Sequence, residues 1–558
     1  MKRKQALCAL TALCLTASLL GGCSGAGTGT PVDQGTPTPA PATGPAPVET
    51  PAQPSSGEPK YGGEIVAYIG GDPMNLDPAV LTNYNATMII SNLAEGLLRL
   101  APAGADIEPG IAESWACSDD GLTWTFHLRG DAKFHNGRTV EAADFKYTFE
   151  RIVNPATMSA KAWMFSNVAG AEAFSAGAAD EITGIQAPDP QTLTITLNQP
   201  MAPFLSMMAS PNLAVVPREV VEQYGEDFGK HVCLSGPFRL QEWTTNGDVV
   251  LTASEDYWAG RPYLDSVRYR VINDENTRIV EFDAGQLDVV WIPSQHWDRY
   301  RSDPVMKDYI GRADTVHTDY FVINMDKAPL NSSPELRQAI FYGLDMQAIV
   351  DYNMGRCAVA DGILPPNMLG SKPTTDSLFN LEKAKELLAQ AGYPDGVPGT
   401  FELLIPAWPN FIKICEIYQQ NLKNLGINVE LRPLEDNAYN DALVSGDFEI
   451  AWGNRVAEYA DSDAYFYPLY HSSNAGVGGN VARYSNPEAD KLIEQARLST
   501  DSAEREALYN QLNALVDADM PYIYLTHNQY FDITQPYVRG YQPSPLDLQN
   551  FMHVWLDK

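Results

Sequence analysis

The sequence predicts an α/β protein of several domains that follows an exported, unfolded leader. Alternating apolar residues in the first half predict half-buried strands, and a strand–helix–strand order between Phe401 and Leu431 predicts a parallel-sheet unit. Near Tyr61 a stretch rich in Pro, Thr and Gly also gives way to one rich in aromatic and aliphatic residues. About five hundred residues follow, a length that predicts two to four domains.

The leader begins like a signal peptide. Lys2, Arg3 and Lys4 precede the apolar run Ala6 to Leu20, which is too short to cross a hydrocarbon core of roughly 30 Å comfortably. The run ends in Leu20-Gly21-Gly22-Cys23, which resembles the lipobox of bacterial lipoproteins. That resemblance implies cleavage before Cys23 and its lipidation; the alternative is an ordinary cleaved signal in which Cys23 is incidental.

A tether is predicted between Ser24 and Pro59. The segment holds nine prolines and no aromatic residue, so it cannot bury enough apolar surface to fold. An extended chain at ~3 Å per residue would reach on the order of 100 Å. We expect residues 24–59 to be a spacer between a membrane anchor and a folded body, rather than a leader without a role.

The charge of the chain is strongly acidic. Seventy Asp and Glu residues against 38 Lys and Arg give a net charge of −32, which repels phosphate backbones and argues against a nucleic-acid partner. Four cysteines lie beyond the leader, widely spaced and without a C-x-x-C pattern: Cys117, Cys233, Cys357 and Cys415. A metal cluster is therefore not expected, whereas one or two disulfides are compatible with export, with three complete pairings open.

Strand patterns dominate the first half of the folded part. Leu122, Trp124, Phe126 and Leu128 alternate with polar residues, and the pattern recurs from Leu193 to Leu197. This period of two predicts strands with one buried face, typical of an antiparallel sheet.

The second half shows helix signals between strands. Phe401 to Ile405 predicts a strand, Asn410 is the expected N-cap of a helix to about Leu425, and a second strand begins at Ile427. Another helix is expected over residues 380–391. This order predicts parallel strands joined by a crossover helix.

Motifs of catalysis are missing from the sequence. There is no G-x-S-x-G, no G-x-x-x-x-G-K-[ST] and no H-E-x-x-H pattern. Carboxylates are so numerous that pairing any two as a glycosidase couple carries no weight. We therefore predict no catalytic residue, no metal ligand and no cofactor.

Short segments with distinctive residues follow one another along the folded chain. They are Tyr61-Gly62-Gly63, Asn75-Leu76-Asp77-Pro78, Glu95-Gly96-Leu97-Leu98, residues 109–115, 124–129, 133–137 and 143–145, Ser235-Gly236-Pro237-Phe238, Tyr257-Trp258, residues 336–340 and Leu344-Asp345. In their order and spacing these segments resemble the extracellular solute-binding proteins of family 5, the oligopeptide and dipeptide receptors of ABC importers.

The resemblance implies a two-lobed periplasmic-binding-protein-like clamp of α/β class with an additional α+β domain beside the first lobe. Mapped onto this chain, lobe I would comprise residues 60–94, 218–318 and 523–558, the extra domain 95–217, and lobe II 319–522. Hinges would fall near Val316 to Tyr320 and Met520 to Ile523.

One segment bears on the ligand: FEIAWGNRVAEYADSDAYFYPLY, residues 448–470. In peptide-binding relatives its backbone pairs with the peptide and an Asp captures the ammonium group. Here Ala457 and Tyr459 match, and Glu458 stands at the Asp position. Main-chain pairing and a fixed carboxylate would recognise many peptides irrespective of sequence. Asp461 and Asp463 are the alternative ammonium partners.

Three further positions in that segment depart from the relatives, and one of them is Ser462, which stands where they carry Pro. Arg455 stands where they carry Trp, and Trp452 stands where some carry an Arg that holds the ligand carboxylate. Either the anion contact has moved between them, or Trp452 packs in the core and Arg455 faces solvent. The expected ligand contacts are Trp452, Arg455, Val456, Ala457, Glu458, Tyr459, Asp461 and Trp163.

These features predict a lipid-anchored, extracytoplasmic receptor, monomeric and non-enzymatic, that captures a peptide for an ABC permease and its ATPase. The family also includes receptors for nickel chelates, haem, opines and oligosaccharides, so a non-peptide solute is an alternative. Exposed tryptophans would favour a sugar. An exported glycosidase is the alternative from another class.

Overall fold

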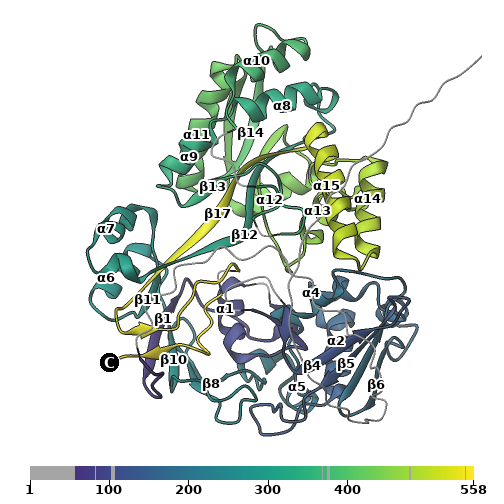
Figure 1. Cartoon of the computed structure of the whole chain (residues 1–558), viewed down its shortest axis with the longest axis vertical. Coiled ribbons are helices and arrows are strands. Elements are labelled where there is room, and N and C mark those ends of the chain that lie inside the picture. The colour runs from purple at the N-terminus through teal and green to yellow at the C-terminus, as the bar shows by residue number, and fades with distance from the viewer. Residues whose placement is uncertain are drawn as a thin grey trace, which may run out of the picture. The chain divides into compact units, whose positions relative to one another are not determined.

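Three β-sheets of four or more strands organise the part of the chain that this computed structural model describes (Figure 1). That part comprises residues 57–81, 83–101, 107–366, 368–373, 378–476, 479–546 and 548–558. The predicted signal peptide, Cys23 and all but the last three residues of the predicted tether therefore lie outside the described residues.

The first sheet has the order β1-β10-β9-β8. Its strands are β1 (Glu64–Ile69), β10 (Ser266–Val271), β9 (Val249–Ala253) and β8 (Phe238–Trp243). β1 pairs with β10 in parallel, although about two hundred residues separate them, and the other pairs are antiparallel. Helix α1 (Tyr84–Leu93) is capped by the Asn83 side chain and contributes to the apolar core of this sheet.

The end of the chain returns to this first core. Asn92 on α1 donates to the carbonyl of Gln549 at 2.5 Å and accepts from the amide of Phe551 at 3.0 Å. Phe551 and Val554 are buried in the same cluster. A short ladder of β18 (Val538–Arg539) and β19 (Trp555–Leu556) closes the terminus.

The second sheet confirms the antiparallel prediction for the first half. Its order is β4-β5-β7-β6, with β4 (Ala112–Cys117), β5 (Thr123–Leu128), β7 (Thr192–Thr196) and β6 (Ile185–Asp189). The apolar residues of the predicted strands are buried, Phe126 completely so, except Leu122, which precedes β5 and is half-buried. Helix α2 (Ala142–Val153) packs on the sheet and begins with a reciprocal capping box between Glu141 and Asp144.

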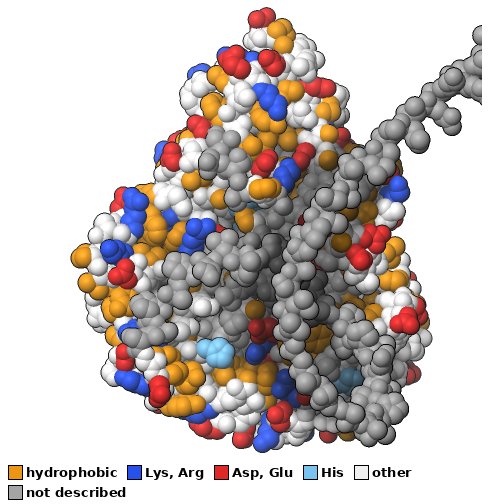
Figure 2. Space-filling view, in the orientation of Figure 1, with side chains coloured by type: hydrophobic (Ala, Val, Ile, Leu, Met, Phe, Trp, Pro, Cys, Tyr) orange, Lys and Arg blue, Asp and Glu red, His pale blue; other side chains and the backbone are white. Residues whose placement is uncertain are grey.

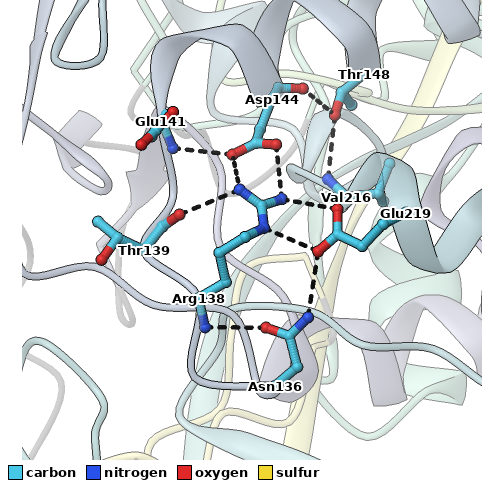
Figure 3. Close-up of polar contacts among 8 residues, drawn as sticks. All are labelled: Asn136, Arg138, Thr139, Glu141, Asp144, Thr148, Val216 and Glu219. Carbon is cyan, nitrogen blue, oxygen red and sulfur yellow. Dashed lines mark hydrogen bonds and ion pairs between the residues drawn. The ribbon is translucent and has the colours of Figure 1, made fainter.

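An arginine links α2 to the segment that leads back to the first sheet (Figure 3). Arg138 donates to both carboxylate oxygens of Asp144 at 2.8 and 2.9 Å and to Glu219 at 2.8 and 3.1 Å. Thr148, which donates to the carbonyl of Asp144, accepts from the amide of Val216 at 3.1 Å. Glu219 lies in α5 (Arg218–Tyr224), so the network fixes α5 against α2.

The third sheet contains the predicted parallel unit. Its order is β11-β17-β12-β16-β14-β15, and β13 pairs with β17. The strands are β11 (Val289–Trp291), β12 (Ile310–Ile323), β13 (Cys357–Val359), β14 (Thr400–Pro406), β15 (Asn428–Leu434), β16 (Ile450–Val456) and β17 (Tyr522–Thr534). β14 pairs in parallel with β15 and β16, whereas the remaining pairs are antiparallel.

The crossover helix α11 (Pro409–Asn424) starts one residue before its expected cap. Trp408, not Asn410, occupies the N-cap position, and its side chain makes no capping bond. Pro409 explains the shift, because proline is preorganised for the first helical position and needs no amide partner there. The expected helix at 380–391 is α10 (Leu381–Gln390), which Asn380 caps by accepting from the amide of Lys383.

Helices lie to either side of β12 and β17 in Figure 1, with α9 and α11 on one side and α14 and α15 on the other. The bounds not yet given in this part are α8 (Pro334–Gly343), α9 (Met346–Tyr352), α12 (Asp436–Ser445), α13 (Asp463–Tyr470), α14 (Pro487–Leu498) and α15 (Ser502–Asp519). Elsewhere they are α3 (Ala171–Ser175), α4 (Phe204–Met208), α6 (Glu275–Asp283), α7 (Trp297–Ser302), β2 (Leu98–Leu100) and β3 (Ile107–Pro109).

The long strands β12 and β17 join the two lobes of the fold. They pair antiparallel, with register shifts between Asp314 and Thr318 and again between Asp319 and Tyr320. The exact residue boundaries expected for the lobes and the extra domain stay predictions.

Other sequence expectations concern cysteines and charge. Cys117, Cys233, Cys357 and Cys415 are each free. None of the described helices combines the length and apolar character that a bilayer span requires. On the face shown in Figure 2, acidic and basic side chains are interspersed.

Candidate functional site

The predicted ligand segment follows β16 and is fixed to strand β12. The amide of Ala457 donates to the carbonyl of Val316 at 2.9 Å. Tyr465, on α13, donates to the same carbonyl at 2.8 Å and to that of Arg455 at 3.0 Å. These bonds hold the turn from Ala457 to Asp461 beside one of the expected hinges.

Glu458 faces a cation from the expected extra domain. Its carboxylate lies 3.0 Å from the ammonium of Lys161 and 4.0 Å from the guanidinium of Arg455, and its side chain is 34% exposed. The carboxylate for which a solute ammonium was expected is therefore paired with a lysine of the protein itself, and its role in ligand binding stays a prediction. Sequence reasoning missed Lys161, whose only signal is its position two residues before Trp163, because its partner lies 297 residues further on.

Aromatic rings extend this cluster. Trp163 is 40% exposed and its ring lies 6.3 Å, centroid to centroid, from the buried ring of Tyr459. Burial raises the pKa of Tyr459 well above its ordinary value, and its hydroxyl donates to Asp463 at 2.8 Å. Trp163, Arg455, Glu458 and Tyr459 therefore lie together, and their contact with a ligand stays a prediction.

The remaining predicted contacts differ in exposure. The side chain of Ala457 is buried, whereas that of Val456 is 47% exposed. Asp461 is turned inward and paired with Arg505 at 2.7 Å. Asp463 is buried beside Arg497 at 3.4 Å, and burial raises its pKa. All three carboxylates are thus paired with a cation, and Glu458 differs from the two alternative ammonium partners in being the most exposed.

Trp452 is buried and packs edge-to-face against two rings. Its centroid lies 5.9 Å from Phe321 and 4.9 Å from Phe411. Arg455 is not simply solvated, because its Nε donates to the carbonyl of Ala464 at 2.9 Å. Trp452 nonetheless borders a cavity of about 390 Å³, whose walls also include Tyr320, Trp408, Phe411 and Arg455. A residue that packs in the core can therefore also shape a binding space.

The segment also meets helix α4 and the residues before it. Ser206 donates to the carbonyl of Ala460 at 3.3 Å, and the amide of Ala202 donates to the carbonyl of Arg497 at 2.7 Å. Together with the Lys161–Glu458 pair, these contacts bring residues of the expected extra domain against residues of the expected lobe II. The site therefore lies where two parts of the fold converge.

The residues of this cluster can recognise a solute by its charge and its shape. The cluster supplies one carboxylate, two cations and aromatic faces, which can bind charged and apolar groups of a solute. Among the described residues, no group of three His, Cys, Asp or Glu side chains is placed to hold a metal ion.

Two lobes joined by a pair of long strands, with an additional α+β domain beside the first lobe, define a clamp of the periplasmic-binding-protein class. A sequence model described as bacterial extracellular solute-binding proteins, family 5 Middle, matches residues 106–477. The chain belongs to this family of solute-binding proteins, which places its folded part outside the cytoplasm.

Relatives and solved structures agree with this assignment. The chain is 31% identical over 484 residues to the probable deoxycholate-binding periplasmic protein YgiS of Escherichia coli, covering 84% of this chain and 89% of that protein. It is 30% identical over 502 residues to the periplasmic oligopeptide-binding protein OppA of the same organism, covering 87% and 90%. The structure of HbpA2 from Haemophilus parasuis matches with a TM-score of 0.77 at 27% identity, covering 88% and 100%.

A further structural match contains a bound peptide. The periplasmic binding protein DppA from Helicobacter pylori, in complex with the peptide STSA, matches with a TM-score of 0.72 at 26% identity, covering 89% of this chain and 99% of that one.

Proposed function

We propose that this chain is a lipid-anchored receptor that captures a peptide outside the cell membrane and delivers it to the permease and ATPase of an ABC importer. The observation that carries the peptide assignment is the carboxylate of Glu458, which is bound by the ammonium group of Lys161 at 3.0 Å. A solute ammonium would exchange with Lys161 at the same carboxylate.

The surrounding segment supports this choice. The backbone from Val456 to Asp461 follows a strand and could pair with an extended peptide, while Trp163 and Tyr459 cover the ammonium end. Recognition through the main chain and a fixed charge tolerates varied side chains. Closing the lobes excludes water and strengthens the charged contacts. Binding then proceeds without chemistry, and the receptor acts as a monomer.

A non-peptide solute is the second candidate. The indole of Trp163 is 40% exposed and that of Trp408 is 49% exposed, so both can stack on a flat or apolar solute. Relatives of comparable identity are named for deoxycholate and for heme. A glycosidase is not favoured, since Asp461 and Asp463 are already paired with Arg505 and Arg497 and the matching family and relatives are binding proteins.

The test is to identify the solute that the protein carries. Protein purified from its own cells without denaturation is examined by native mass spectrometry, and the released solute is sequenced or fragmented. Calorimetry with the synthetic solute then measures the affinity. Recovery of peptides supports the proposal, whereas recovery of a bile acid, porphyrin or sugar would replace it with the second candidate.

A further inference from the structure

Two buried aspartates follow Glu458 in the turn that carries it. The side chains of Asp461 and Asp463 are 9% and 1% exposed, each beside an arginine. Glu458 is more open to solvent, at 34% exposed. Removing a carboxylate from water is costly, so a buried one that persists in a fold calls for an explanation. The two aspartates differ in what they hold.

Asp461 fastens the end of the turn to helix α15. One of its carboxylate oxygens accepts from Arg505 Nη2 at 2.7 Å and from the hydroxyl of Tyr509 at 3.4 Å, and both donors lie on α15. The same oxygen accepts from the backbone amide of Asp463 at 2.9 Å. Hydrogen bonds between ionised groups are shorter and stronger than neutral ones. The bond from Arg505 is therefore the main attachment of the turn to this helix.

The direction of the Arg505 guanidinium is itself fixed. Its Nε donates to the carbonyl of Ala496, on helix α14, at 3.0 Å, and its Nη2 also donates to the hydroxyl of Tyr509 at 2.8 Å. The guanidinium is planar and rigid, so bonds at two of its nitrogens set its orientation. Asp461 therefore meets a fixed donor, and the turn takes a place that α14 and α15 determine.

Asp463 makes a different attachment. Its Oδ1 lies 3.4 Å from Arg497 Nε without a hydrogen-bond partner among the described residues, and the Arg497 guanidinium lies 3.6 Å from the ring centroid of Tyr467. The other oxygen of Asp463 accepts from the hydroxyl of Tyr459 at 2.8 Å. Asp463 therefore holds an aromatic side chain of the turn, whereas Asp461 holds the course of its backbone.

Glu458 lies between two backbone attachments. At one end the amide of Ala457 donates to the carbonyl of Val316 on β12 at 2.9 Å, and at the other end Asp461 is bound to Arg505. A short segment that is fixed at both ends restricts where its side chains can point. The place of the Glu458 carboxylate therefore depends on the pair of Asp461 and Arg505.

We propose that Asp461 and Arg505 are a positioning pair, which holds the turn so that the carboxylate of Glu458 faces the solute ammonium and thereby sets the preference for solutes with a free amino group. This inference rests on the proposed function and deepens it. Arg505 acts through Asp461 and does not touch the solute. Without solute, the same placement holds Glu458 3.0 Å from the ammonium of Lys161. Loss of the pair should therefore show both in binding and in the empty protein.

The binding test uses a set of synthetic tri- to pentapeptides without lysine, each made with a free and with an acetylated amino end. Competition between the two forms for the full chain is measured by capture and mass spectrometry. We expect the wild type to prefer the free-amino forms by about tenfold or more, and Arg505→Gln to lose most of this preference. Arg505→Lys should keep part of it, because lysine supplies the charge without the planar fork. Asp461→Asn should behave like Arg505→Gln and replaces it if that variant does not fold.

Arg337→Gln is the matched control for the loss of a buried arginine. Arg337, on helix α8, is 2% exposed and donates to the carbonyls of Asp519 at 2.6 Å and of Leu330. Its loss should lower the melting temperature, because two carbonyls lose their donor, while the preference for a free amino end stays as in the wild type. An equal loss of preference in Arg337→Gln would mean that Arg505→Gln acts through general destabilisation, and would overturn the inference.

A second measurement needs no solute. The side chain of Lys161 is 20% exposed and paired with Glu458, so its amine should react slowly with an acetylating ester. In Arg505→Gln this pair loosens, and Lys161 should be acetylated several times faster, as measured by mass spectrometry after digestion. Lys491, whose side chain is 57% exposed, is the internal reference and should react equally in both proteins. An unchanged rate at Lys161 would overturn the inference.

The outcomes separate this inference from the proposed function. A wild type that prefers free-amino peptides, together with an Arg505→Gln variant that prefers them equally, overturns the positioning pair and leaves the receptor standing. A wild type that binds both forms equally overturns the ammonium contact and the inference with it. A wild type that binds neither form counts against a peptide ligand, and the rate at Lys161 then decides whether Asp461 and Arg505 position Glu458.

Discussion

At the scale of single residues, we expect substitutions of Glu458 and of Lys161 to change peptide affinity in opposite directions. Glu458→Gln removes the proposed partner of the solute ammonium, and at 34% exposed the charge pair is partly screened, so binding of a free-amino peptide should weaken about tenfold to a hundredfold. Lys161→Ala removes the lysine that competes with the peptide for Glu458, so this variant should bind the peptide more tightly than the wild type. N-acetylation of the peptide should lower its affinity for the wild type strongly and its affinity for Glu458→Gln only slightly, because both changes remove the same contact.

Calorimetry on each combination of protein and peptide measures these effects. Strictly additive losses, with Glu458→Gln still discriminating against the acetylated peptide, would show that another group binds the ammonium. Weaker binding by Lys161→Ala would show that Lys161 supports the site instead of competing for it.

The predicted attachment to the membrane depends on Cys23. In Cys23→Ala the protein should appear in the medium or remain unprocessed, since the lipidated cysteine is the proposed attachment to the membrane. Fractionation and labelled palmitate measure this. A variant that stays with the membranes and takes up as much palmitate as the wild type would remove the lipoprotein assignment.

Asp532 predicts a pH dependence of stability. Its carboxyl is buried, accepts from Tyr541 at 2.7 Å, and burial raises its pKa from 3.8 to about 6. The folded state therefore holds this proton more tightly than the unfolded state, so its contribution is full at low pH and is lost as pH rises through about 6. The loss amounts to at most about 3 kcal/mol.

Asp532→Asn should keep the bond from Tyr541 without the charge. We expect a variant more stable than the wild type by about 1–2 kcal/mol near neutral pH, with a smaller decline in stability as the pH rises from 3.8 to about 6. Denaturant unfolding at several pH values measures both. An unchanged pH slope would mean that Asp532 is solvated or already ionised in the fold.

At the scale of elements, the Arg138 network predicts how firmly the second sheet is attached. Arg138→Met keeps the apolar stem but leaves Asp144 and Glu219 without their shared donor (Figure 3). Because Arg138 is 36% exposed, we expect a modest loss of about 1–2 kcal/mol in the free energy of unfolding. Urea denaturation measures it.

Arg218→Met is the matched control. Arg218 pairs with Glu222 on the same helix and its side chain is 66% exposed, so the change should stay within about 0.5 kcal/mol. Equal losses in the two variants would show that the network adds nothing beyond a surface ion pair.

Elements with a strong local signal could be predicted from the sequence. Neighbouring residues determine the alternation around Trp124 and Phe126 and the strand–helix–strand order around α11. The structure confirms both. The start of α11 was misplaced, because Asn410 is a favoured cap whereas the fixed backbone of Pro409 decides the first turn. The two-lobed arrangement was predicted from the resemblance to family motifs, because no local sequence pattern indicates it.

Contacts between distant segments could not be predicted. Lys161 reaches Glu458 across 297 residues, and nothing in the sequence around Lys161 distinguishes it from a solvated lysine. The ligand segment was located by its motif, whereas the charges that face it depend on the tertiary fold.

At the scale of the whole molecule, the paired strands β12 and β17 predict a hinge motion. The expected crossings near Val316–Tyr320 and Met520–Ile523 remain a prediction, for which the ladder offers a physical basis. Its register shifts on either side of Thr318, and a ladder with shifted register bends more easily than a regular one. A solute that contacts both lobes should therefore favour the closed arrangement.

Small-angle scattering with and without a confirmed solute measures the closure as a smaller radius of gyration. Lys161→Ala, which removes an ion pair between the two converging parts, should shift the empty protein toward larger radii. Lys385→Ala, which removes an exposed pair within one helix, should leave both profiles as they are. An unchanged profile at saturating solute would contradict the clamp, because binding between two lobes without closure leaves the solute in contact with water and gives the permease no distinct form to recognise.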